Sequence, residues 1–285
     1  MQSKFSILKN MIWALAIVVT LAALFIGLIL GTFKKYPGEQ QDGILYLGNR
    51  PAGSAPADDS PADSSSGEAE DAISPADGPL NLLPETEDGG EAYIDSLTFL
   101  CDTSLMGLKN YELLKGGHQT EQFWGTEAGN MPANSIASAN IVNPSDGVIM
   151  PPAMAAGINQ PQILVISIGM DGLASANAQQ FISDYIDLIN SIKEQSPSTR
   201  IILCSPTSVI NSYDGIDNTT VALCNELKGW IETVCKSTGV YYADIARAVC
   251  DPSGTLLNEY ASTNGKTITS SGLEKILMYL RTHKL

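Results

Sequence analysis

Ile163-Leu164-Val165-Ile166-Ser167-Ile168 is a nearly continuous apolar run, and it decides the fold class of the chain. A strand covered on both faces has this composition, whereas a strand with one face in water alternates apolar and polar residues. Similar runs follow at Ile201–Cys204 and Val240–Tyr242, and a less continuous one precedes at Leu97–Cys101. The pattern therefore predicts buried, parallel strands.

Segments with apolar residues at helical spacing separate and follow these runs. They are Gln179–Gln195, Val221–Thr238 and Ser270–Thr282. Strands that alternate with helices in this way indicate one α/β domain, over residues 92–285, with a parallel sheet and helices on both sides. Ligands of such sheets bind at the carboxyl ends of the strands, so we look for function in the loops after Cys101 and Ile168.

A hydrophobic segment precedes the domain. Met11–Leu30 is a run of 20 residues in which only Thr20 and Gly27 are not strongly apolar. About 20 such residues cross a bilayer core, so the run predicts a transmembrane helix, with residues 1–10 as a short cytoplasmic tail. Flanking lysines are equal in number and do not fix orientation, and a cleaved signal peptide is the alternative. We expect a single-pass protein of the cell membrane with its domain outside the cytoplasm.

Residues 31–91 are predicted to be a disordered linker. Between Pro51 and Ala92 the chain holds 11 acidic residues and no Lys or Arg. Such a segment cannot bury enough apolar surface to offset the entropy of ordering it. The other 20 acidic residues face 16 basic ones, so most of the net charge of −15 lies in the linker. A chain this acidic is not expected to bind nucleic acid.

Cysteine and histidine are too sparse for several kinds of site. The cysteines are odd in number and show no C-x-x-C spacing, so neither a zinc ribbon nor a disulfide scaffold is indicated. They are Cys101, Cys204, Cys224, Cys235 and Cys250. His118 and His283 are the two histidines, and any mechanism with a histidine base must use one of them.

Three blocks of the domain resemble the SGNH (GDSL-type) hydrolases. Phe99–Leu108 is similar to the family's first block, and Ile168–Gly172 to its G-x-N block. Glu259–Tyr260, Asn264–Gly272 and Tyr279–His283 are similar to its closing stretch. The resemblance implies a flavodoxin-like three-layer α/β/α sandwich. It also implies acyl transfer by a serine that a histidine base activates, with the oxyanion held by the serine amide, a glycine amide and an asparagine side chain.

The resemblance places substituted residues at each catalytic position. Thr103 stands at the nucleophile, Asp171 at the oxyanion asparagine, and Asn264 and Thr267 at the aspartate and histidine. The neighbouring loop positions are Asp102, Ser104 and Gly169. An ionised Asp171 accepts hydrogen bonds and would repel an oxyanion, and neither histidine is spaced to approach Thr103.

These substitutions predict a catalytically inactive hydrolase-like domain that binds a cell-envelope carbohydrate or a partner protein. We expect an uncharged or cationic saccharide, with Asp102, Asp171 and Trp124 as contacts. No cofactor is predicted, and two carboxylates are too few for a metal site. The alternatives are an active serine-type esterase or deacetylase on an acylated cell-wall saccharide, and a structural interaction module. The oligomeric state is not predicted.

Overall fold

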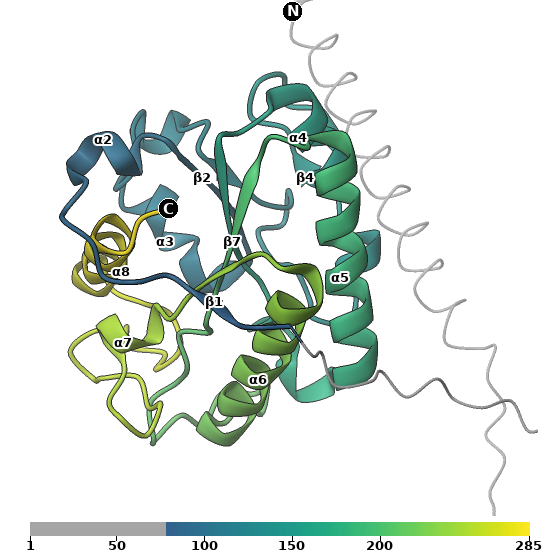
Figure 1. Ribbon diagram of the computed structural model, residues 1–285. Coiled ribbons are helices and arrows are strands. Elements are labelled where there is room, and N and C mark those ends of the chain that lie inside the picture. Colours follow the sequence, from purple (N-terminus) through teal and green to yellow (C-terminus); the bar gives the residue numbers. More distant parts are fainter. Residues whose placement is uncertain (1–77) are drawn as a thin grey trace, which may run out of the picture. The chain divides into compact units, whose positions relative to one another are not determined.

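The computed structural model describes residues 78–285, which form one α/β unit (Figure 1). Six parallel strands make its sheet, in the order β1-β8-β7-β6-β2-β3. The strands are β1 (Asn81–Leu82), β2 (Leu97–Cys101), β3 (Phe123–Trp124), β6 (Ile163–Ser167), β7 (Arg200–Cys204) and β8 (Tyr241–Ala243). Without β1, this is the flavodoxin order, and it reverses between β2 and β6. The predicted parallel α/β fold is confirmed.

Helices cover both faces of the sheet. On one face lie α4 (Pro152–Asn159), α5 (Ala178–Gln195) and α6 (Val221–Thr238). On the other lie α2 (Gly90–Ile94), α3 (Gly107–Asn110), α7 (Ala246–Val249) and α8 (Ser270–Thr282). The short elements are β4 (Ile141–Val142), β5 (Ile149–Met150), η1 (Thr103–Leu105), η2 (Gly117–Gln119), η3 (Ile136–Ser138) and η4 (Leu173–Ser175).

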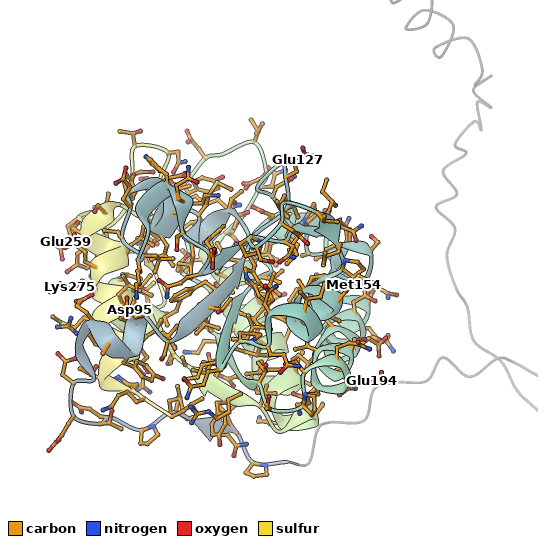
Figure 2. The ribbon with its side chains drawn as sticks, turned by 90° about the horizontal axis from the view of Figure 1, so that it is seen from above. Asp95, Glu127, Met154, Glu194, Glu259 and Lys275 are labelled. Carbon is orange, nitrogen blue, oxygen red and sulfur yellow. The ribbon has the colours of Figure 1, made fainter. Side chains whose placement is uncertain are left out.

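The side chains of β6 show why the sheet is sandwiched. Ile163 and Val165 point into the core under α8, whereas Leu164 and Ile166 point into the core under α5 and α6. Successive side chains of a strand face opposite sides of the sheet, and helices cover both sides, so all four side chains are buried. Seen from above, charged side chains such as Glu194 lie at the outer surface (Figure 2).

The domain begins before residue 92, the boundary that we predicted from the sequence. β1 pairs with β8 through Asn81 and Leu82, and Leu83 is buried. Arg281 of α8 holds the following segment through ion pairs with Asp88 and Glu91. The boundary predicted at residue 92 is therefore wrong, because part of the acidic segment contributes an edge strand to the sheet.

The other N-terminal predictions concern residues outside the described part of the chain. They are the tail at residues 1–10, the membrane span Met11–Leu30 and the linker up to residue 77. Within residues 78–285, none of the helices combines the length and apolar character that a membrane crossing requires.

The five cysteines are free thiols. Cys101, Cys204, Cys224 and Cys235 are fully buried, and Cys250 is partly buried with its Sγ donating to the carbonyl oxygen of Thr207 at 3.2 Å. Burial raises the pKa of each thiol, to about 12 for Cys235 and Cys250.

Candidate functional site

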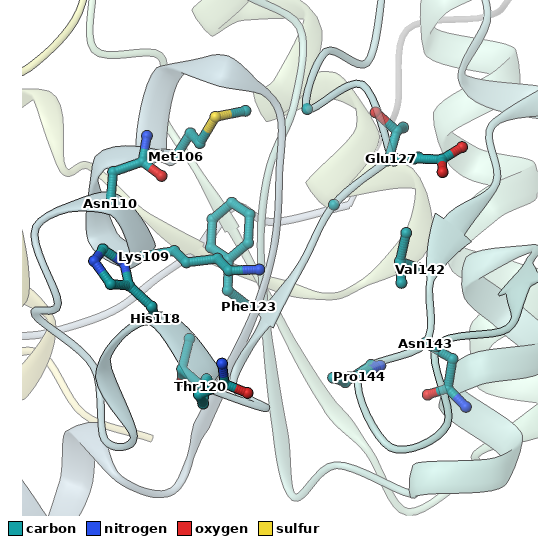
Figure 3. Close-up of a pocket in the computed structure, with 15 residues that line it drawn as sticks. Met106, Lys109, Asn110, His118, Thr120, Phe123, Glu127, Val142, Asn143 and Pro144 are labelled. Carbon is teal, nitrogen blue, oxygen red and sulfur yellow. The ribbon is translucent and has the colours of Figure 1, made fainter. Parts of the chain in front are cut away.

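Two neighbouring cavities flank the loop after β2: one lies at the carboxyl end of β2, next to the point where the sheet order reverses, and the other lies toward the edge strand β3. The Thr103 cavity has a volume of about 420 Å³ and is lined by η1, α3 and the loop before α8. The Lys109 cavity, of about 530 Å³, lies beside it (Figure 3), and Met106 and Asn110 line both. The Thr103 cavity is lined by Thr103, Ser104, Met106, Gly107, Asn110, Tyr111, Thr267 and Ile268.

Asp102 joins the two loops of the site from inside the protein. Its Oδ1 accepts hydrogen bonds from the amide and hydroxyl of Ser104, at 2.9 and 2.6 Å. Its Oδ2 accepts the amides of Gly169 and Met170, at 2.9 and 2.8 Å. Burial raises the pKa of Asp102, and the nearby Asp171 carboxylate raises it further. The side chain is fully buried, so the prediction of Asp102 as a ligand contact is wrong.

Gly169 gives the loop after β6 the path that these bonds need. Its φ is +130°, a conformation that side-chain-bearing residues rarely adopt. A Cβ at this position would lie 2.9 Å from a methyl group of Leu227. Gly169 is thus a positioning residue, since it lets consecutive amides reach Asp102.

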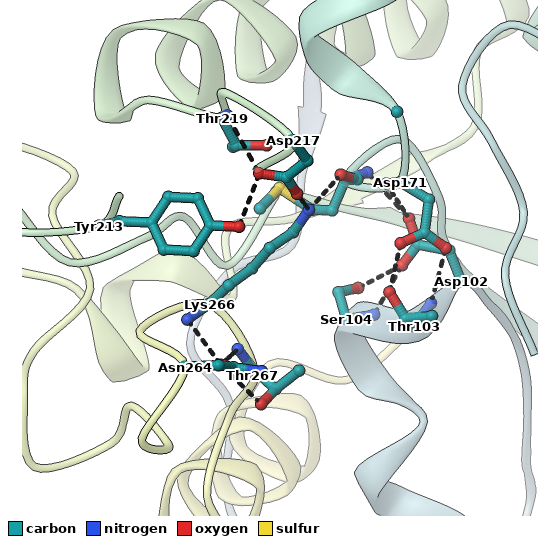
Figure 4. Close-up of polar contacts among 12 residues, drawn as sticks. Asp102, Thr103, Ser104, Asp171, Tyr213, Asp217, Thr219, Asn264, Lys266 and Thr267 are labelled. Carbon is teal, nitrogen blue, oxygen red and sulfur yellow. Dashed lines mark hydrogen bonds and ion pairs between the residues drawn. The ribbon is translucent and has the colours of Figure 1, made fainter. Parts of the chain in front are cut away.

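Asp171 is bonded to the residue at the nucleophile position. Its Oδ2 accepts the amide of Thr103 at 3.2 Å and the amide of Met131 at 3.0 Å. Its Oδ1 accepts a short hydrogen bond from the Thr103 hydroxyl. Both carboxylate oxygens are therefore occupied by donors from within the domain (Figure 4).

The closing motif makes a self-contained turn. Asn264 Oδ1 accepts the amides of Lys266 and Thr267 at 3.0 and 2.9 Å, and the Thr267 hydroxyl at 3.0 Å. Thr267 also lines the Thr103 cavity, whereas Asn264 does not. The structure thus brings Thr103 and Thr267 to one cavity and leaves Asn264 behind it.

A comparison with protein families agrees with the resemblance that three blocks of the sequence show. Residues 133–270 match the GDSL-like Lipase/Acylhydrolase family. The matched stretch lies within the described α/β unit and supports its resemblance to the GDSL-like hydrolases. The matched residues include Asp171, Asn264 and Thr267, and they begin downstream of Thr103.

The α/β unit is also similar to solved structures. A putative platelet activating factor from Streptococcus pneumonia is 13% identical, over 65% of this chain and 82% of that chain, with a TM-score of 0.49. A carbohydrate esterase family 3 from Talaromyces cellulolyticus is 17% identical, over 64% and 92%, with a TM-score of 0.40. A GDSL-like lipase from Bacteroides thetaiotaomicron is 13% identical, over 66% and 86%, with a TM-score of 0.43. No curated protein matches the chain.

Neither histidine lies at the Thr103 cavity. His118 Nε2 lies 2.8 Å from Glu112 in the Lys109 cavity wall, where both side chains are largely exposed. His283 stacks on Tyr279 at a ring separation of 3.8 Å, and its Nδ1 lies 2.9 Å from the Tyr279 carbonyl oxygen. Among residues 78–285, Thr103 therefore has no histidine placed to take its proton.

The aromatic contact predicted from the sequence is wrong. Trp124 is 1% exposed although β3 is an edge strand, because its side chain packs in the core that α4 and α5 cover. Tyr111 lines the Thr103 cavity instead and is 49% exposed. A tyrosine just after a four-residue helix carries no sequence signal that would have identified it.

Lys266 is a member of the site that sequence reasoning missed. Its Nζ donates to the carbonyl oxygen of Met170 at 2.9 Å and to Asp217 Oδ2 at 2.5 Å (Figure 4). Tyr213 donates to the other oxygen of Asp217 at 2.6 Å. Partial burial opposes ionisation of Asp217, yet the hydrogen bonds from Lys266 and Tyr213 lower its pKa to about 2. Lys266 thus ties the closing turn to the Asp171 loop.

Proposed function

We propose that this chain is a membrane-anchored, extracytoplasmic GDSL-type domain that has lost acyl-transfer chemistry and binds a cell-envelope saccharide. The observation that carries the proposal is the pair of hydrogen bonds from Thr103 to Asp171. Anchoring rests on the apolar run Met11–Leu30 in the sequence.

The Asp171 carboxylate stands where an oxyanion would have to form. The resemblance assigns the Thr103 amide to oxyanion binding, and that amide donates to Asp171. Losing one oxyanion donor costs about 10²–10³ in rate in other acyl-transfer enzymes. Here the donor is replaced by an ionisable acceptor, so a developing negative charge meets repulsion instead of stabilisation.

The lining of the Thr103 cavity supports saccharide binding. Tyr111 offers a half-exposed aromatic ring, and Asn110 beside it offers an amide. Rings of this kind pack on the apolar face of a sugar while amides and hydroxyls bond its hydroxyl groups. Because both oxygens of Asp171 are occupied, these groups replace it as the expected contacts.

The first test measures chemistry. We expect the full chain in detergent to hydrolyse a chromogenic acetyl ester no faster than a Thr103→Ala variant does. A wild-type rate that Thr103→Ala abolishes would establish the alternative, an active esterase. One observation favours that alternative, because a carboxylate bonded to a hydroxyl has the geometry of a general base.

The second test measures binding. We expect chitotetraose to bind the full chain in calorimetry, and Tyr111→Ala to weaken it about tenfold because the stacking ring is lost. Tyr241→Ala is the matched control, since Tyr241 is also exposed but begins β8, away from the carboxyl ends of the strands. Equal binding by wild type and Tyr111→Ala would contradict the assignment. No glycan binding at all would favour the interaction-module alternative.

A further inference from the structure

The Lys109 cavity is larger than the Thr103 cavity and has a different chemistry. It is built from α3, η2, the loop after β3 and the β4–β5 connection, and a volume of about 530 Å³ is large enough for a sugar residue. Phe123 forms an apolar part of the wall, and polar side chains project around it (Figure 3).

Lys109 has no partner among residues 78–285. Neither a hydrogen bond nor an ion pair engages its Nζ in this part of the chain, although its side chain is half-buried. Figure 3 shows it extending from α3 past Phe123 toward the opposite wall. An ammonium group without a counter-ion at a cavity wall attracts an incoming anion.

The other charged groups at the cavity do not neutralise Lys109. His118 is next to Lys109 in the lining and is bonded to Glu112, while Glu127 stands on the loop after β3 and is exposed. Glu127 therefore opposes an anionic ligand from the far side, and Lys109 is the cation placed to attract it. Neutral donors and acceptors, including the Asn110 amide shared with the Thr103 cavity, complete the wall.

We propose that the Lys109 cavity binds the carboxylate of an acidic sugar residue, whose neutral neighbour occupies the Thr103 cavity. This inference rests on the proposed function and adds the charge of the ligand to it. The shared residues Met106 and Asn110 make the two cavities adjacent, as two consecutive sugars of one chain require. The expectation of an uncharged or cationic saccharide then applies to the Thr103 cavity alone.

The test compares ligands that differ in charge at one group. The probes are a tetrasaccharide of alternating N-acetylglucosamine and N-acetylmuramic acid with free lactyl carboxylates, its methyl ester, and chitotetraose. We expect the free acid to bind the full chain about tenfold more tightly than the ester, and the difference to shrink at high salt. Equal affinity of acid and ester would overturn the inference while leaving glycan binding intact. Failure of all three probes to bind would overturn the proposed function as well.

Variants locate the effect. Lys109→Met should remove the preference for the acid and leave chitotetraose binding unchanged, which also shows that the variant folds. Lys115→Met is the matched control, because Lys115 pairs with Asp95 and does not line the cavity. Glu127→Gln should increase the preference for the acid severalfold, because an opposing carboxylate is removed. A preference that survives Lys109→Met contradicts the proposal.

Discussion

Asp171 differs from asparagine by a single atom, and that atom reverses the direction of the hydrogen bonds that the position can make. An amide nitrogen would donate into the cavity, whereas the carboxylate draws the amide and hydroxyl of Thr103 toward itself. The chemistry of the site is thus set by whether position 171 donates or accepts hydrogen bonds.

Restoring hydrolysis should require several changes at once. We expect Thr103→Ser alone to give no esterase activity, because no histidine is placed to activate the serine and Asp171 still occupies the oxyanion position. The combined Thr103→Ser, Asp171→Asn, Asn264→Asp, Thr267→His variant should gain measurable hydrolysis, because Thr267 shares the cavity with Thr103. Release of a chromogenic acetyl ester's product is the measurement, and activity in the single variant would show that the positions are matched wrongly.

The Asp217–Lys266 pair should make stability depend on acid. The folded pKa of Asp217, about 2, lies below the usual 3.8, so the pair stabilises the fold above pH 4 and loses its effect as the pH falls toward 2. Asp217 is partly exposed, and solvent screening limits the effect to about 1–2 kcal/mol. Thermal unfolding of Asp217→Asn should show a smaller loss over this range than wild type, with Asp214→Asn as control. Parallel curves for wild type and Asp217→Asn would refute the pair's role.

At the scale of elements, β1 is a short strand whose removal should be costly. A fragment that begins at residue 92 lacks β1 and the buried Leu83, and Leu83→Ala alone should cost about 2–5 kcal/mol. We expect fragment 78–285 to melt at a higher temperature than fragment 92–285. Limited proteolysis checks the same boundary: cuts should fall before Gly78 and spare Asn81–Ile94. Equal melting temperatures would mean that β1 contributes no stability.

The long elements could be predicted from the sequence, and the two-residue strands could not. The expected helix Val221–Thr238 coincides with α6, and the apolar run Ile163–Ile168 contains β6, because periodicity over many residues is a strong signal. β1 and β3 are defined by the neighbours they pair with, so two residues of local sequence cannot reveal them.

The candidate site could be located from the sequence but not detailed. The order of strands placed the loops of Asp102 and Asp171 together, as expected for the point where a parallel sheet reverses its order. Burial of Asp102 and Trp124 depends on tertiary packing, which periodicity does not report. Lys266 lies 49 positions after Asp217 in the sequence, so no local pattern marks the pair.

For the whole molecule, we expect the mature chain to keep its N-terminal segment. The apolar run is long enough to span a bilayer, so the chain should remain with membranes after an alkaline carbonate wash. The same chain without residues 1–30 should stay in the supernatant. Sequencing that finds a mature N-terminus between Gly31 and Gly43 would show that the segment is a signal peptide.

The five free thiols have a practical consequence for following this molecule. Because four are sealed in the core and the fifth is tied to a backbone carbonyl, a thiol-reactive dye has little to label while the domain is intact. Opening of the sheet exposes cysteines from β2, β7 and α6 together. Dye incorporation into the purified chain therefore reports unfolding without an engineered cysteine. The four buried thiols are shielded from oxidants in the same way while the fold holds.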